Sequence, residues 1–312
     1  MLWTIASFGR AFFIHLAALL VGLVFIKISF SINRQGDHGR LDVLSYNVRV
    51  FNNYTHLRNE QHESSKKMIG WSVGHKAQIK CFQEYYNSDK STVFNVKNQL
   101  IEHGWKNIHS KIVLRDRSGA EFGLAIFSKF KMVNKGEIKG KSGEYLNSIY
   151  ADILVDKDTV RIYNTHLQSM AINEENVVNT ERLAQSYKDT GWRLRSGFVT
   201  RARQVNALMA HIELCPYPII LCGDLNEIPY SYAYFSLRGK LHNAFEKAGR
   251  GFGFTYNGKL FFLRIDNQFF SKEMEVRRFV THRDVPYSDH FPLSASYHWS
   301  LVPPDRQVDH SP

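Results

Sequence analysis

The chain has 312 residues, of which 44% are hydrophobic and 13% aromatic, so a sizeable core can form in one large domain or two small ones. Its three cysteines, Cys81, Cys215 and Cys222, form no CxxC pair, which excludes a zinc-ribbon or disulfide framework as the basis of the fold. The formal net charge is +11; residues 1–40 carry +3 and the remainder +8. A basic domain favours acidic partners such as phosphates, nucleic acid or anionic lipid, although the charge also serves solubility.

The N-terminal segment is apolar over residues 11–26 apart from His15. Extended to residue 30, it would cover about 30 Å as a helix, roughly one bilayer core. We therefore predict a transmembrane anchor over residues 1–30; a cleaved signal peptide and a buried helix are the alternatives. No small-x-small cleavage site follows the run, which favours the anchor over the signal peptide. Basic residues flank both ends, so the side of the membrane that the domain faces stays open.

Residues 31–40 are polar with two glycines and are predicted to form a linker. We expect one catalytic domain over residues 41–302 and a disordered tail over 303–312. Short apolar runs that end in polar residues predict strands, and VTRARQVNALMAHIEL has the spacing of a helix. Strands that alternate with helices indicate an α/β architecture. Residues 171–200 are weakly patterned and are predicted to form an inserted loop with some helix.

Polar side chains follow most of these predicted strands. They are Asn47, Glu84, His166, Asp224, Asn226, Asp266, Asp289 and His290. Each motif alone is weak, because Asp and Asn are common in turns and a strand often ends in a solvated polar residue. Together they are informative, since a rigid sheet is a good platform for groups that must converge. Carboxylate and amide oxygens without soft ligands suit Mg²⁺ or Mn²⁺, and histidines can bind a phosphate or donate a proton to it.

The motifs YNVRVFN, QE, FGLAIFSK, THL, GDLNEIP, RID and SDHFPL, in this order, resemble the endonuclease/exonuclease/phosphatase superfamily, which includes deoxyribonucleases, apurinic endonucleases, neutral sphingomyelinases and inositol polyphosphate phosphatases. The likeness spans about residues 41–300. It implies a four-layer α/β sandwich of two packed mixed β-sheets flanked by helices, here preceded by the transmembrane helix. The segments SYNVRVFN, YPIILCGDLNEIPYSYAY and GFGFTYNGKLFFLRID are similar to membrane-anchored members from Bacteroidetes-type bacteria, which implies the bacterial inner membrane as location.

The resemblance also implies roles for the metal and the attacking water. Glu84 matches the metal-binding glutamate, with Asn47 and Asp289 beside it in the metal shell. Asp224 matches the aspartate that orients or deprotonates the water, and Asn226 the asparagine that holds nucleophile and phosphate.

Further matched positions concern the phosphate. His290 matches the phosphate-contacting histidine, with Asp266 as its carboxylate partner. His166 matches the histidine of the deoxyribonuclease-like and sphingomyelinase-like branches. Glu121, seven residues before Ser128, matches the glutamate that pairs with that histidine, so we expect a hydrogen bond that raises the pKa of His166.

Two features complete the likeness. Arg201 and Gln204 match an R-x-x-Q helix that serves as scaffold and can reach phosphate. After RID this chain has Asn267-Gln268-Phe269 where the family commonly has an aromatic residue or histidine and then an aliphatic one, a departure that bears on the packing of Asp266.

Three functions follow from these patterns. The first is a membrane-tethered, Mg²⁺- or Mn²⁺-dependent phosphodiesterase of nuclease type, which the His166 and Glu121 matches favour. The second is a phospholipid headgroup hydrolase of sphingomyelinase or phosphoinositide-phosphatase type, held beside its substrate by the anchor. The third is a non-catalytic binding module, against which the intact polar set argues, because buried charges without a use are costly. The expected partners are a phosphodiester, in nucleic acid or a lipid headgroup, and the membrane; we expect a monomer.

Overall fold

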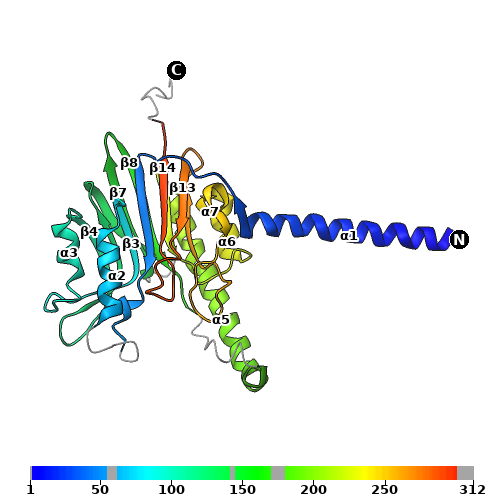
Figure 1. Ribbon diagram of the computed structural model, residues 1–312, viewed down its shortest axis with the longest axis horizontal. Coiled ribbons are helices and arrows are strands. Elements are labelled where there is room, and N and C mark those ends of the chain that lie inside the picture. The colour runs from blue at the N-terminus through cyan, green and yellow to red at the C-terminus, as the bar shows by residue number, and fades with distance from the viewer. Residues whose placement is uncertain (1, 55–61, 141–144, 170–179, 301–312) are drawn as a thin grey trace.

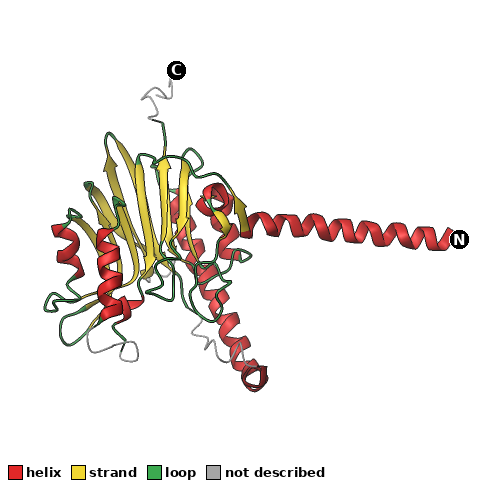
Figure 2. Ribbon diagram, in the orientation of Figure 1, coloured by secondary structure: helices red, strands yellow, loops and turns green. Residues whose placement is uncertain are grey.

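The computed structural model describes residues 2–54, 62–140, 145–169 and 180–300. Two six-stranded mixed sheets pack face to face, and helices cover their outer faces (Figures 1 and 2). The first sheet has, in spatial order, β13 (Glu275–Thr281), β14 (Leu293–His298), β2 (Leu41–Asn47), β3 (Ile79–Asn87), β5 (Glu121–Ser128) and β4 (Asn107–Arg115). The second has β10 (His242–Asn243), β12 (Asp266–Phe270), β9 (Ile219–Asp224), β8 (Asp158–His166), β7 (Tyr145–Val155) and β6 (Met132–Lys139).

The pairs β2/β3 and β8/β9 are parallel, and the other pairs within the two sheets are antiparallel. The helices are α1 (Leu2–Ser29), the 3₁₀ turn η1 (Arg49–Asn52), α2 (Glu63–Gly74), α3 (Val96–Glu102), α5 (Thr180–Glu213), α6 (Tyr232–Lys240) and α7 (Ala244–Ala248). The predicted α/β sandwich of two mixed sheets flanked by helices is therefore confirmed.

Because β9 is pleated, its alternate side chains contribute to two different hydrophobic layers. Ile220 and Cys222 belong to the core between the sheets, whereas Ile219 and Leu221 pack beneath α5 and α6. Side chains alternate along a strand, so Asp224 falls on the same face as Cys222. The strand therefore delivers its last carboxylate into the space between the two sheets.

Strand β2 does the same from the opposite sheet. Leu41 and Val43 face the inter-sheet core, and Leu44 and Tyr46 face the layer of α2 and α3. Asn47 continues the inward series and ends the strand. A polar brace crosses the core close to this end, where Asn164 Nδ2 donates to Phe82 O at 2.9 Å and Gln83 Nε2 donates to Asn164 Oδ1 at 2.6 Å.

The N-terminal helix α1 points away from the two sheets (Figure 1). Among the described residues, no helix combines the length and the apolar character needed to cross a membrane, so the predicted transmembrane helix is not supported. The apolar run between Arg10 and Lys27 covers residues 11–26 and includes His15, whereas a transmembrane helix needs about 20 mainly apolar residues.

The segment predicted as a linker lies against the domain. Strand β1 (Phe30–Ile32) pairs with β11 (Arg250–Phe252), and Gln35 Nε2 donates to the carbonyl oxygens of Ala248 and Phe279. Within the predicted insertion, α5 covers residues 180–200. Residues 171–179 of that insertion and the predicted tail at 303–312 lie outside the described residues.

Candidate active site

Three of the polar residues predicted from the sequence converge on a carboxylate oxygen of a fourth, Asp224. Asp224 Oδ2 accepts a hydrogen bond from Asn47 Nδ2 at 3.0 Å and lies 3.5 Å from His166 Nε2 and 3.8 Å from His290 Nε2. Asn47 comes from the first sheet, and Asp224 and His166 come from adjacent parallel strands of the second, where they are directly opposite each other. The Asp224 carboxylate is 1% exposed, so its charge acts in a medium that screens it weakly.

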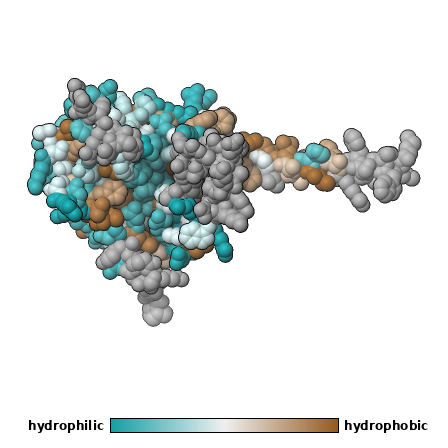
Figure 3. Space-filling model, turned by 90° about the horizontal axis from the view of Figure 1, so that it is seen from below, coloured by the Kyte–Doolittle hydropathy of each residue, from teal (hydrophilic) through white to brown (hydrophobic). Residues whose placement is uncertain are grey.

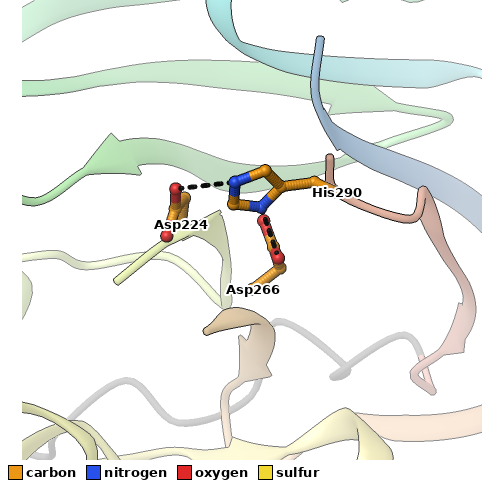
Figure 4. Close-up of side chains that lie close together, drawn as sticks. All are labelled: Asp224, Asp266 and His290. Carbon is orange, nitrogen blue, oxygen red and sulfur yellow. Dashed lines mark hydrogen bonds and ion pairs between the residues drawn. The ribbon is translucent and has the colours of Figure 1, made fainter. Parts of the chain in front are cut away.

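His290 lies between two buried carboxylates (Figure 4). Its Nδ1 is 2.8 Å from Asp266 Oδ2, and its Nε2 faces Asp224. Burial alone would lower the pKa of His290, but Asp266 and Asp224 outweigh that effect and raise the pKa to about 10. The ring is therefore an imidazolium at neutral pH, with Nδ1–H donating to Asp266.

The backbone around Asp266 is well fixed. Asp266 begins β12 and is the register partner of Asp224 on β9. Thr255 Oγ1 accepts hydrogen bonds from the backbone N–H groups of Ile265 and Asp266, both at 3.1 Å. Gln268 stands at one of the positions where this chain departs from the family pattern. Its Nε2 donates to Leu293 O at 3.0 Å, which links the two sheets beside Asp266.

Asn226 is held in a left-handed turn after β9. Its φ is 48°, its N–H donates to Asp224 Oδ1 at 2.8 Å, and its Nδ2 donates to Leu167 O at 2.9 Å. Asn tolerates this conformation better than most residues. The turn therefore fixes the second oxygen of Asp224 and leaves the Asn226 amide oxygen as an acceptor.

A bulge in β3 sets the direction of Glu84. Phe82 pairs with Ala125 and Tyr85 with Gly123, so Gln83 and Glu84 oppose one residue of β5. Glu84 takes the extra position with φ 49°. Without the bulge, Glu84 would share the outward face of Phe82; an extra residue of this kind re-aims a side chain. Glu84 Oε2 accepts from Tyr54 OH at 3.3 Å.

Asp289 lies close to this second group of charges. Its Oδ2 is 3.2 Å from Arg49 Nε, and its Oδ1 accepts from Ser288 Oγ at 3.2 Å. Burial and the charge of Glu84 raise the pKa of Tyr54 to about 12, with a smaller contribution from Asp289. Glu84, Asp289, Arg49 and Tyr54 thus form one charged neighbourhood beside Asn47.

The predicted hydrogen bond between Glu121 and His166 is not formed. Glu121 Oε1 pairs with Arg115 Nη2 at 2.5 Å, its neighbour across β4 and β5. The reason is the pleat: Glu121 lies an odd number of residues from Leu124 and Ile126, which face the inter-sheet core, so Glu121 points to the opposite face from that core. His166 instead lies against Asp224.

Arg201 and Gln204 on α5 hold the loops that follow β8 and β9. Arg201 is fully buried; its Nε donates to Glu227 Oε1 at 2.6 Å and its Nη1 to Gln168 O at 2.9 Å. Gln204 Oε1 accepts from Gln168 N. Both residues therefore act as scaffold, and the buried guanidinium of Arg201 does not reach a surface phosphate.

Four residues of the site were not singled out from the sequence: Arg49, Tyr54, Thr255 and Tyr256. Arg49 lies within the quoted YNVRVFN motif, but nothing in that motif reveals the left-handed turn over Arg49–Asn52, where φ runs from 44° to 57°. Tyr256 and His290 form an isolated antiparallel β-bridge, and the ring of Tyr256 packs against the imidazole at 5.4 Å between centroids. No local signal identifies Tyr54 or Thr255, because only the folded chain brings them to the site.

Two groups of residues could hold a metal ion. Among the described residues, one cluster of three side chains has ligand atoms within 4.8 Å of one another: Asp224, Asp266 and His290. In that cluster the Nδ1 of His290 is already bonded to Asp266. The second group is the predicted set of Glu84, Asn47 and Asp289, whose donors are oxygens only. This set fits Mg²⁺ or Mn²⁺ better, since such ions prefer carboxylate and carbonyl oxygen.

Comparison with known proteins agrees with this fold. A family model described as the Endonuclease/Exonuclease/phosphatase family matches residues 44–290. No curated protein matches the chain. A solved endonuclease/exonuclease/phosphatase structure from Beutenbergia cavernae aligns with a TM-score of 0.61 at 14% identity, covering 86% of this chain and 72% of that one.

Two further structures show the same fold. The human Nocturnin catalytic domain, solved with a bound sulfate anion, aligns with a TM-score of 0.59 at 18% identity, covering 86% of this chain and 98% of that one. A mannosyl-6-phosphatase from Bacteroides thetaiotaomicron aligns with a TM-score of 0.51 at 19% identity, covering 82% and 99%. With the family model matched over most of its length, the chain belongs to the endonuclease/exonuclease/phosphatase family and is a phosphoric ester hydrolase.

Proposed function

We propose that the chain hydrolyses a phosphodiester with Mg²⁺, or Mn²⁺, by attack of a water molecule held at Asp224. The observation that carries the proposal is the convergence of Asn47, His166 and His290 on Asp224 Oδ2. A buried carboxylate with an imidazolium beside it provides an acceptor for the water proton and a donor for the phosphate within one site.

The metal would be held by Glu84 with Asn47 and Asp289. When bound, it would neutralise charge on the phosphoryl group and stabilise the leaving oxygen. The directed bulge at Glu84 supports this assignment, because it places a carboxylate beside Asn47 that the regular pleat would turn away.

The chain's own groups divide the remaining work. Asp224 Oδ2 would orient the water and accept its proton, while the Asn226 N–H keeps the carboxylate from rotating. His290 would donate Nε2–H to a phosphoryl oxygen, and Asp266 keeps that ring protonated. His166 Nε2 lies 3.5 Å from the same oxygen of Asp224 and would contact the same phosphoryl group.

Arg49 would bind a non-bridging phosphoryl oxygen. Its guanidinium is close to Asp289 and 31% exposed, so substrate can reach it. The turn that presents it is held by Asn52 Nδ2, which donates to Tyr287 O at 2.6 Å, and by Arg49 N–H, which donates to Asn47 Oδ1. Left-handed conformations in four successive non-glycine residues are costly, and such strain gathers at functional sites.

Two substrate classes draw support from different features of the chain. A nucleic-acid substrate draws support from the net charge of +11 and from His166. The expected Glu121 pairing supported it too, and that pairing is absent. A membrane-borne phosphodiester draws support from α1, which exposes large apolar side chains including Phe12, Phe13 and Ile14. We therefore propose that α1 holds the domain at a membrane surface.

The test is hydrolysis of a chromogenic phosphodiester by the full chain with and without chelator. We expect activity to vanish in excess chelator and to return with Mg²⁺ or Mn²⁺, because the proposed metal ligands are two carboxylates and an amide oxygen. Full activity in excess chelator would rule out the mechanism. Plasmid DNA, sphingomyelin and phosphoinositides assayed side by side would then separate the substrate classes.

A further inference from the structure

A surface of exposed apolar side chains surrounds the base of α1. We call it the apolar collar, and it consists of Phe30, Ile32, Ile228, Tyr230, Phe252, Phe261 and Phe262. Phe261 and Ile32 are 65% and 82% exposed. Single exposed apolar residues are ordinary, but a contiguous group marks an interaction surface.

Ring contacts link parts of the collar to one another and to α1. Phe30 packs on Phe252 at 5.0 Å between centroids, and Phe252 stacks on Phe254 at 5.2 Å. Tyr230 packs on Phe25 of α1 at 4.9 Å. The collar therefore extends the apolar surface of α1 onto the domain, and Figure 3 shows hydrophobic residues along α1 as far as the domain.

A cavity of about 210 Å³ opens within the collar. Its walls are apolar except for Ser29 and Arg264, and they include Ile228, Tyr230 and Phe262. Arg264 Nη2 donates to Ile28 O at 3.0 Å, which ties this cavity to the end of α1.

The collar shares its two loops with the active site. Ile228 and Tyr230 follow Asn226 in the loop after β9. Phe252, Phe261 and Phe262 flank Thr255 and Tyr256, of which Thr255 holds the backbone of Asp266 and Tyr256 packs on His290. A partner seated on the collar would therefore contact the segments that carry Asn226, Thr255 and Tyr256.

The charge around the collar favours an anionic surface. Exposed basic residues on its segments are Arg34, Arg250 and Lys259. Across residues 27–35, 225–232 and 249–264, the one carboxylate is that of Glu227, which is buried and paired with Arg201. Aromatic rings with basic side chains and without exposed acids are the composition of surfaces that enter the headgroup region of anionic bilayers.

We propose that the apolar collar docks on an anionic lipid bilayer, so that the catalytic site opens onto the headgroups and the substrate is a phosphoester of a membrane lipid. This rests on the proposed hydrolysis and names its substrate class. The collar continues the surface that α1 already presents, which is why the bilayer, rather than a second copy of the chain or a protein partner, is its occupant.

The first experiment locates the contact without using catalysis. Phe261→Trp and Leu114→Trp in the full chain are compared on vesicles of phosphatidylcholine and phosphatidylglycerol whose acyl chains carry bromine, with wild-type fluorescence subtracted. Leu114 is the matched control, since it is 63% exposed on β4 of the first sheet. We expect bromine to quench Phe261→Trp and not Leu114→Trp. Equal quenching, or a vesicle-bound chain with Phe261→Trp unquenched, would overturn the proposal.

The second experiment tests the substrate class. Phe261→Ser with Phe262→Ser is compared with Val113→Ser with Leu114→Ser for hydrolysis of vesicle phospholipid and of a soluble chromogenic phosphodiester. We expect the ratio of vesicle to soluble activity to fall at least about tenfold in the first pair and to stay unchanged in the second, since each buried Phe contributes a large transfer free energy.

Other outcomes would indicate that the collar binds something other than a bilayer. An unchanged ratio, or self-association that Phe261→Ser with Phe262→Ser abolishes, would replace the bilayer by another occupant. If the wild type does not hydrolyse the soluble substrate, the proposed function is wrong. The quenching result would still decide whether the collar contacts lipid.

Discussion

At the scale of single residues, Asp224 and His290 are the groups on which the proposed chemistry depends most. We expect Asp224→Asn and His290→Ala each to lower turnover by two to three orders of magnitude or more, because loss of a preorganised partner in such sites costs about 2.7–4 kcal/mol. Steady-state kinetics on a soluble phosphodiester, with circular dichroism to confirm folding, measures this.

The matched control for that experiment is Glu121→Gln. Its carboxylate pairs with the exposed Arg115 and lies on the face turned away from His166, and exposed ion pairs contribute little. We expect its turnover to stay within about threefold of the wild type. A folded Asp224→Asn or His290→Ala within tenfold of the wild type, about 1.4 kcal/mol, would remove that residue from the catalytic set.

Arg49 is a second test at this scale, with binding of inorganic phosphate as the readout. We expect Arg49→Gln to weaken phosphate binding about tenfold or more in calorimetry with Mg²⁺ present, since a hydrogen bond to a charged group contributes about 1.5–3 kcal/mol. Arg49→Lys should recover part of the affinity because it keeps the charge and loses the fork of donors.

The control is Arg115→Gln, which breaks an ion pair away from the site and should leave phosphate binding unchanged. If Arg49→Gln binds phosphate normally and Mg²⁺ more tightly, then Arg49 serves to neutralise Asp289 and does not bind substrate.

At the scale of secondary-structure elements, the end of α2 contributes to acid sensitivity. His75 follows α2; burial, His282 and Lys80 together lower its pKa to about 3. Between about pH 6.5 and pH 3, His75 is protonated in the unfolded chain and neutral in the folded chain. Its contribution to the free energy of unfolding is therefore fully present above about pH 6.5 and decreases as the pH falls.

From about pH 7 to pH 5, we expect the free energy of unfolding to fall less in His75→Gln than in the wild type, by about 1–2 kcal/mol. The reason is that a pKa shift of one unit corresponds to about 1.4 kcal/mol. Urea denaturation at the two pH values measures the difference, with the exposed His103→Gln as control. Equal losses in His75→Gln and the wild type would show that His75 is protonated in the folded chain.

At the scale of the whole molecule, α1 and the sandwich have separable roles. Ile28 is buried in the domain core and its carbonyl oxygen accepts from Arg264, and Asn33 and Gln35 bond to the domain. A truncation at residue 41 would therefore remove folded contacts, whereas a chain of residues 28–312 keeps them and removes the exposed part of α1.

We expect the chain of residues 28–312 to hydrolyse a soluble phosphodiester as fast as the full chain and to lose activity on vesicles, because α1 raises the effective concentration of a membrane-borne substrate without adding a catalytic group. The measurement is the ratio of full-length to truncated activity on vesicles and on DNA. No activity on vesicles, with cleavage of DNA by both chains, would favour the nucleic-acid substrate.

Local patterns in the sequence were enough to predict the α/β class and the polar residues that end the strands. This was possible because apolar runs of strand length, with polar residues at their ends, are local patterns. The order of the motifs GDLN, RID and SDH can also be read directly from the sequence. Asn47, His166, Asp224, Asp266 and His290 were all chosen in this way, and the structure brings them together.

The directions of these side chains and their partners from distant parts of the chain depend on strand pairing and could not be predicted. The pleat turned Glu121 away from His166, and a bulge that depends on pairing with β5 turned Glu84 toward Tyr54. The left-handed turn at Arg49 is likewise held by contacts made far away in the chain. A one-residue change in register reverses the face of a side chain, and register is set by partner strands that the local sequence does not specify.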